Sequence, residues 1–152
     1  MSTITLQSTV RRVLVEKRPG FDLEAQSLKK DLIESLHIDT IEDIRVLNRY
    51  DVEDLTEDVL ENAAKTIFSE ANLDLVSYDK VEDINENDRV FAIEYLPGQY
   101  DQRGDWAAQC IQIVNNGKRP NISTAKVYIL SGNISDEDFE RIKSYCINPV
   151  DS

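Results

Sequence analysis

Two short stretches of the chain share one pattern, Glu-x-x-Pro-Gly: EKRPGF at Glu16–Phe21 and EYLPGQY at Glu94–Tyr100. Each ends an apolar run that alternates as a β-strand does, at 10–17 and at 89–96. Proline fixes φ where a strand stops, and glycine adopts backbone conformations that are costly for other residues. We therefore predict two structural turns, each leading from a strand into a helix, at Pro19, Gly20, Pro97 and Gly98.

The elements predicted after the first turn recur in order after the second. Helical spacing of apolar residues and N-cap residues mark the helices, and runs of β-formers mark the strands. The first pass predicts a strand at 10–17, a helix capped by Asp22, a strand at 41–52, a helix capped by Thr56 and a short strand at 73–79. The second pass predicts a strand at 89–96, a helix at about 104–115, a strand at 124–132 and a helix capped by Ser135.

Matching positions indicate an internal duplication, because caps align with caps and apolar stripes with apolar stripes. The matches are Glu16/Glu94 and Pro19/Pro97 at an offset of 78, Ala25/Ala108 at 83, Val46/Val127 at 81, and Thr56/Ser135, Leu60/Phe139 and Ile67/Cys146 at 79. The rise from 78 to 83 predicts five extra residues within 98–106 of the second copy.

This stretch, GQYDQRGDW, combines donors, acceptors, both charges and an aromatic ring, a composition typical of recognition loops. We predict that it contacts a partner domain through Gln99, Tyr100, Asp101, Gln102 and Arg103. A plain surface insertion is the alternative. Trp106 begins the next helix and is expected to anchor the loop in the core or in an interface.

The duplication predicts an α+β fold in which two β-α-β-α halves form a two-layer pseudo-dimer. Each half is too small to bury a large core alone, and a pseudo-twofold arrangement lets one half cover the other. The predicted organisation is an N-terminal tail at 1–9, a first half at 10–79, a connector at 80–88, a second half at 89–148 and the start of a linker at 149–152.

Composition narrows the classes of partner. The chain has 152 residues, 41% of them hydrophobic, and a formal net charge of −12. Phosphate-binding surfaces need clustered lysine and arginine, so we expect neither nucleic acid nor an anionic membrane as a partner. No apolar run approaches the roughly 20 residues that span a bilayer, and the N-terminus does not resemble a signal peptide, so we expect a cytoplasmic protein.

Candidate catalytic groups are few. The single histidine, His37, lies near a helix end, where it suits the helix dipole. Cys110 and Cys146 match Ser27 and Ile67 and are interpreted as packing residues. With no metal-ligand spacing and no glycine-rich phosphate loop, we predict no catalytic residue, no metal site and no cofactor in this chain. Glu16 and Glu94 are interpreted either as solvated strand positions or as a symmetric carboxylate pair at an interface.

Several strings resemble the N-terminal segment of large, multidomain phosphoribosylformylglycinamidine synthases. They are FAIEYLPGQYDQR, TAKVYIL and INPVDS in the second half, and VEKRPGFD, RVLNRYDVEDL and KTIFSE in the first. The resemblance covers Val10 to Ser152, and LPGQYDQR is its most specific part. The family pattern has small residues after DQR, and Trp106 departs from it.

The resemblance implies a duplicated PurS-like unit and a non-catalytic role in purine biosynthesis. In this family the domain packs beside the synthetase and glutaminase domains of the same polypeptide and supports ammonia transfer. ATP and Mg are implied for the parent enzyme, in domains outside this chain. Two other hypotheses stay open: a stand-alone regulatory module that binds a small metabolite, and an independent enzyme that uses paired carboxylates.

Overall fold

The fold is of the α+β class. The computed structural model describes residues 10–53, 55–70, 72–81, 83–96 and 98–147, which contain four helices and five strands. In chain order they are β1 (Val10–Lys17), α1 (Leu23–Ser35), β2 (Ile41–Glu53), α2 (Glu57–Thr66), β3 (Asp74–Tyr78), β4 (Arg89–Glu94), α3 (Gln102–Val114), β5 (Ile122–Gly132) and α4 (Asp136–Ile147). Among these residues, no helix is long and apolar enough to cross a membrane.

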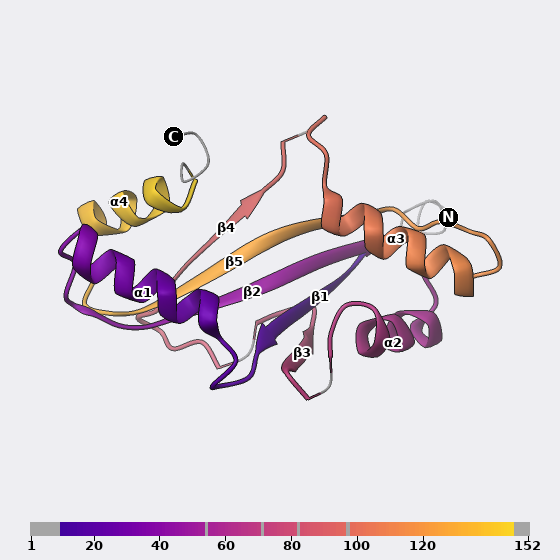
Figure 1. The fold of residues 1–152 in the computed structure, drawn as a ribbon, viewed down its shortest axis with the longest axis horizontal. Coiled ribbons are helices and arrows are strands. Elements are labelled where there is room, and N and C mark those ends of the chain that lie inside the picture. Colours follow the sequence, from indigo (N-terminus) through magenta and orange to yellow (C-terminus); the bar gives the residue numbers. More distant parts are fainter. Residues whose placement is uncertain (1–9, 54, 71, 82, 97, 148–152) are drawn as a thin grey trace, which may run out of the picture.

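The five strands form one antiparallel sheet with the order β3-β1-β2-β5-β4 (Figure 1). The two longest strands, β2 and β5, pair at its centre, so the sheet joins the two halves of the chain. β1 then lies beside β2, and β4 lies beside β5. Each half thus contributes a β-α-β-α run built around one antiparallel strand pair.

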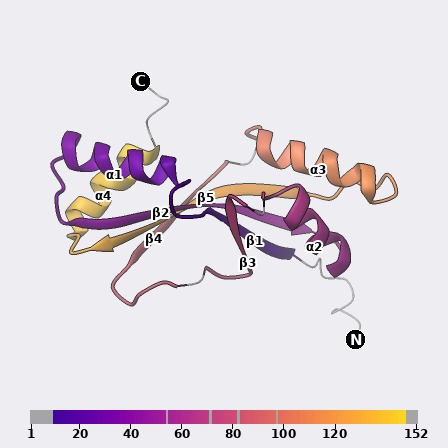
Figure 2. The same ribbon diagram turned by 60° about the horizontal axis from the view of Figure 1, so that its bottom comes forward.

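The helices pack on one face of the sheet in two groups (Figures 1 and 2). α1 and α4 lie at one end, where Leu32, Ile142 and the sheet residue Leu130 are fully buried together. α2 and α3 lie at the other end, where Leu60 and Ile111 join a second cluster with strand residues of β1, β2 and β5. Each cluster therefore draws helices from both halves of the chain, and the two halves share their core.

The other face of the sheet carries a smaller apolar cluster. Because side chains alternate along a strand, Val13 and Val15 face the helices while Leu14 faces the opposite way. Leu14 packs there with residues of β2 and β5, and Val81 of the connector between β3 and β4 lies against them. The connector thus covers part of the face that the helices leave open.

Two of the three predicted N-caps are confirmed. Thr56 Oγ1 accepts a hydrogen bond from Val59 N–H, and Ser135 Oγ accepts one from Asp138 N–H at 3.1 Å. Asp22 makes no side-chain cap bond to the helix backbone. Its carboxylate accepts instead from Gly20 N–H and from the Gln26 side-chain amide. The first turn of α1 therefore has no side-chain cap from Asp22.

The predicted five-residue insertion in 98–106 is wrong. α1 and α3 both have 13 residues, and their first residues, Leu23 and Gln102, are 79 positions apart. At this offset the fully buried Leu32 corresponds to the fully buried Ile111. The match of Ala25 with Ala108 was misleading because alanine recurs in helices, and Gly104 takes the corresponding position. Residues 102–105 form the first turn of α3 and are not an inserted loop.

The match of Val46 with Val127 is also wrong. Val46 packs under the helices, whereas Val127 belongs to the cluster on the opposite sheet face. An odd change of offset moves every side chain to the other face of a sheet. Val13 pairs with Tyr50 and Phe91 with Tyr128, which fits an offset of 78 in both strands.

The backbone conformations of the two turns agree with the sequence prediction. Gly20 and Gly98 both have positive φ, 92° and 90°. Past the ends of α1 and α3, His37 and Asn116 have φ of 57° and 55°, and they are 79 positions apart. Pro19 and Gly20 lie in a turn shortly after β1, as predicted, and Pro97 lies outside the described residues.

Candidate functional site

The predicted contact residues Gln99–Arg103 fall into two groups, and the first group closes the turn. Gln99 N–H donates to Leu96 O at 2.9 Å, and Gln99 Oε1 accepts from Leu96 N–H. Asp101 is the N-cap of α3, with Oδ1 accepting from Gly104 N–H at 2.9 Å. Its carboxylate also accepts from Thr124 N–H at 2.6 Å and from Thr124 Oγ1 at 2.7 Å, which ties the turn to β5.

The second group, Tyr100, Gln102 and Arg103, is exposed. Tyr100 is 68% exposed, and its hydroxyl donates to Asp105 Oδ2 at 2.8 Å. This hydrogen bond raises the pKa of Tyr100 and lowers that of Asp105, which also pairs with Arg119. Of the five predicted residues, Gln99 and Asp101 hold the local structure through side-chain hydrogen bonds to the backbone, whereas Tyr100, Gln102 and Arg103 are exposed and make no such bonds.

The outer face of α3 continues this exposed surface, and the sequence interpretation missed it. Trp106 is 54% exposed, Ile113 82% and Val114 58%. Of the two expectations for Trp106, its exposure excludes the core, and a position in an interface stays a prediction. The buried side of the helix is made by Gly104, Ala107, Ala108 and Ile111. Trp106 and Ile113 are seven positions apart, which is nearly two helical turns, so they lie on the same side of the helix. Both are exposed, so this side faces away from the buried one.

A signal for this surface was present in the composition of the helix. In α3 two of 13 residues are charged, Arg103 and Asp105, whereas six of the 12 residues of α4 are charged. Low charge together with exposed aromatic and aliphatic side chains distinguishes the centre of protein interfaces from ordinary surface. We define the α3 outer face as Tyr100, Gln102, Arg103, Trp106, Ile113 and Val114.

A polar cleft of about 420 Å³ lies beside Arg103, over β1 and β2 and next to the start of α1. Its charged and amide lining residues are Lys17, Asp22, Glu24, Asn48, Asp74 and Arg103. Lys17 Nζ lies 3.0 Å from the buried Asp74 Oδ1, Glu24 pairs with Lys126, and Arg103 Nη1 is 3.5 Å from Tyr50 Oη. Three of the five charged lining residues, Lys17, Asp74 and Glu24, thus have a counter-charge within the chain.

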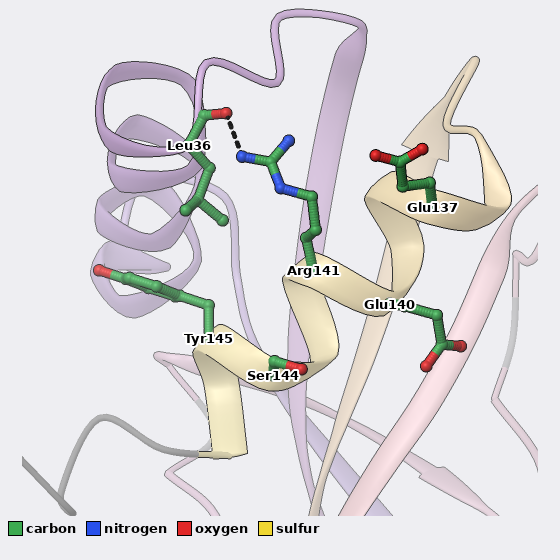
Figure 3. Close-up of a pocket in the computed structure, with 6 residues that line it drawn as sticks. All are labelled: Leu36, Glu137, Glu140, Arg141, Ser144 and Tyr145. Carbon is green, nitrogen blue, oxygen red and sulfur yellow. Dashed lines mark hydrogen bonds between the residues drawn. The ribbon is translucent and has the colours of Figure 1, made fainter.

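A second hollow, of about 700 Å³, lies on the outside of α4 (Figure 3). Five of its six lining residues belong to α4, and the sixth is Leu36 past the end of α1. Arg141 Nη2 donates to Leu36 O at 2.8 Å (Figure 3). The Tyr145 hydroxyl lies 3.3 Å from Asp31 Oδ2. These contacts hold α1 and α4 together, so the hollow is formed by helix packing.

The two strand glutamates lie on the sheet face opposite the helices, and each meets an arginine of β2. Glu16 forms a bidentate salt bridge with Arg45, in which Arg45 Nη2 donates to Glu16 Oε1 at 2.7 Å and Arg45 Nε donates to Glu16 Oε2 at 2.8 Å. The Glu16 side chain is largely buried. Glu94 is mostly exposed and reaches Arg49, over the small side chain of Ala125 on the intervening β5. They therefore do not share one cleft as a catalytic carboxylate pair would.

The thiol of Cys146 is partly buried, and burial raises its pKa to about 11. Such a thiol stays protonated near neutral pH and is a poor nucleophile. Within the described part of the chain, no group of three His, Cys, Asp or Glu residues could hold a metal ion.

Comparison with known proteins identifies no family for this chain. No protein-family model, no curated protein and no solved structure matches the chain.

Proposed function

We propose that the chain is a non-catalytic, PurS-like assembly domain of a phosphoribosylformylglycinamidine synthase. In this role it supports the contacts between the synthetase and glutaminase domains, and with them the transfer of ammonia released from glutamine. The proposal includes the finer architecture, in which the α+β fold is a duplicated unit that forms a two-layer pseudo-dimer.

The observation that carries the proposal is the near-constant offset between the two halves. Strands correspond at 78 and helices at 79, and the agreement extends to the conformations of Gly20 and Gly98. Such a repeat within one sheet, with β2 and β5 antiparallel at its centre, has the geometry of an isologous dimer on one chain. This is the architecture that the resemblance implies, and LPGQYDQR lies at the corresponding turn of the second half.

The α3 outer face supplies the surface that an assembly domain needs. Hot spots of protein interfaces are enriched in tryptophan, tyrosine and arginine, and Trp106, Tyr100 and Arg103 are all exposed there. The charge of −12 over the whole chain favours binding to a partner of opposite charge over self-association.

The test uses the complete polypeptide that the source organism makes, identified by an immunoblot with antibody against this chain. The variants are Arg103→Ala and the pair Trp106→Ser with Ile113→Ser, and the control is Ile84→Ser, an exposed apolar residue of the connector. We expect glutamine-dependent synthesis to fall by at least about tenfold, or ~1.4 kcal/mol, with ammonia-dependent synthesis nearly unchanged. Equal activity of variants and control would contradict the role of this face.

A second candidate function is a regulatory module that binds a small metabolite in the polar cleft. The observation in its favour is that this cleft, with charged groups of both signs, is of a size that could hold a small ligand. A ligand at 100 times its Kd stabilises the protein by about 2.7 kcal/mol. Thermal shifts with nucleotides, amino acids and purine intermediates test this, and Asn48→Ala should abolish any shift. No shift with any of these ligands would count against this second function.

A further inference from the structure

The two outer strands of the sheet differ in what covers them. β1 is followed outward by β3, through five residue pairs from Val13↔Tyr78 to Lys17↔Asp74. β4, which corresponds to β1, is the last strand of the sheet, and no described strand pairs with its outer edge. The first half therefore has an outer strand, β3, that has no counterpart among the described residues of the second half.

The backbone groups at this free edge can be identified from β1. Arg12 O accepts from Asp79 N–H and Arg18 N–H donates to Leu73 O, both at 2.7 Å, so the even-numbered residues of β1 face β3. At an offset of 78, and because strand backbones alternate, Val90, Ala92 and Glu94 direct N–H and C=O to the free edge. At Leu96, which corresponds to Arg18, the Gln99 side chain accepts the N–H and ends the edge.

The side chains of β4 do not protect this edge. In β1, Val13, Leu14 and Val15 are buried, whereas β4, with the sequence RVFAIE, has no buried residue. Val90 is 43% exposed. Free edges of folded proteins are normally blunted by charged side chains, proline or a β-bulge. The charges of β4, Arg89 and Glu94, stand at its two ends, and its middle residues, Val90 to Ile93, carry none and pair with β5 without a bulge. The regular, apolar middle of this edge is a template for another strand.

The repeat identifies the strand that fits. α2 and α4 begin 79 positions apart, at Glu57 and Asp136. At this offset the counterpart of β3 falls at positions 153–157, and at the strand offset of 78 it falls at 152–156, so by either offset it extends past Ser152.

We propose that a sixth strand, from polypeptide that follows Ser152, pairs antiparallel with β4 by strand addition. This inference rests on the proposed function, in which the chain is the head of a longer enzyme. It gives each half an outer strand and makes the sheet symmetric about the β2–β5 pair.

Hydrogen exchange of the backbone amides tests the proposal. The amides of Val90, Ala92 and Glu94 are compared between the 152-residue chain and the complete polypeptide of the source. We expect exchange to slow by at least about tenfold in the complete polypeptide, because paired amides exchange only after local opening. Equal rates in the two proteins would overturn the proposal. Protection that rises with concentration of the 152-residue chain would also overturn it, since the occupant would be a second copy.

Ala92→Pro supplies the structural control, because it removes an outward N–H and no bond to β5. Ala92→Val keeps the N–H. In the complete polypeptide, Ala92→Pro should remove the protection of Val90 and Glu94 and Ala92→Val should not, while the 152-residue chain keeps its circular dichroism spectrum with both. Protection that survives the proline would show that β4 is covered in another way.

The outcomes separate this inference from the proposed function. A longer polypeptide with glutamine-dependent synthase activity and rapidly exchanging β4 amides would overturn the sixth strand alone. A longer polypeptide with protected β4 amides and no such activity would overturn the function alone. A source protein of 17.4 kDa would overturn both.

Discussion

Arg89 of β4 pairs with Asp136, the first residue of α4, at 2.8 Å. Arg11 of β1 makes the corresponding pair with Glu57, the first residue of α2. The arginines are 78 positions apart and the acidic residues 79. The two pairs thus join the same two elements in each half, and each acidic residue also suits the positive end of its helix dipole.

These ion pairs are expected to contribute little stability. The Asp136 side chain is 95% exposed, and exposed pairs contribute about 0–1 kcal/mol. A double-mutant cycle of Arg89→Ala and Asp136→Ala should give a coupling free energy below about 1 kcal/mol, which 1 M salt removes. A larger coupling that persists in salt would mean that the pair is better shielded than its exposure indicates.

Gly20→Ala and Gly98→Ala should destabilise the protein to a similar extent. A Cβ at either position would meet no atom within 4 Å, so the cost comes from positive φ alone. That cost is about 1–2 kcal/mol per residue, measurable by denaturant unfolding.

Asparagine tolerates this conformation better than alanine, so Gly20→Asn and Gly98→Asn are matched controls and should lose less. If the alanine variants were neutral, the two turns would not depend on left-handed backbone.

Asp101→Ala should be much more damaging than Asp22→Ala. Asp101 caps α3 and accepts two hydrogen bonds from Thr124, whereas Asp22 makes no cap bond. Loss of a cap costs about 0.5–2 kcal/mol, and each lost bond to a charged group about 1.5–3 kcal/mol. We expect Asp101→Ala to lose more than about 2 kcal/mol and Asp22→Ala less than 1 kcal/mol of unfolding free energy. Similar losses would contradict the special role of Asp101.

Asp79 should contribute to stability at neutral pH and lose this contribution in acid. The Arg11 guanidinium hydrogen-bonds its carboxylate and lowers the pKa of Asp79 below the ordinary 3.8. Because the folded-state pKa is the lower one, the stabilisation is complete above about 3.8 and disappears as pH falls through the folded-state pKa.

The test is the pH dependence of unfolding for wild type and Asp79→Asn, in which asparagine retains the shape and tolerates the local φ of 67°. The advantage of wild type should shrink between about pH 4 and pH 2. A difference that stays constant over this range would exclude the carboxylate as its source.

Alkylation of Cys146 should be slow at pH 7 and should increase with pH up to about 11, the pKa to which burial raises the thiol. The thiolate is the reactive form, so the rate should rise about tenfold per pH unit below the pKa. The measurement uses Cys110→Ser so that one thiol reacts, with the unfolded protein as control. A plateau near pH 9 would mean that the thiol is solvated.

The sequence by itself determined the local structure. The alternation of apolar residues defined the strands, proline and glycine placed the turns, and Thr56 and Ser135 marked helix starts, because each of these signals acts within a few residues. The repeated Glu-x-x-Pro-Gly pattern likewise indicated two matching halves. For α3 the start was predicted two residues late, because Asp101 was interpreted as part of a contact loop and not as a cap.

The tertiary structure decided what depends on partners distant in sequence. Identical residue types suggested the matches Ala25/Ala108 and Val46/Val127, but the strand register and the buried helix face exclude both. The tertiary structure also determined that Asp101 accepts hydrogen bonds from Thr124, that Glu94 forms an ion pair with Arg49 and that no described strand covers the outer edge of β4. Such relationships follow from the packing of strands and helices far apart in the chain, and a single sequence does not record which residues meet there.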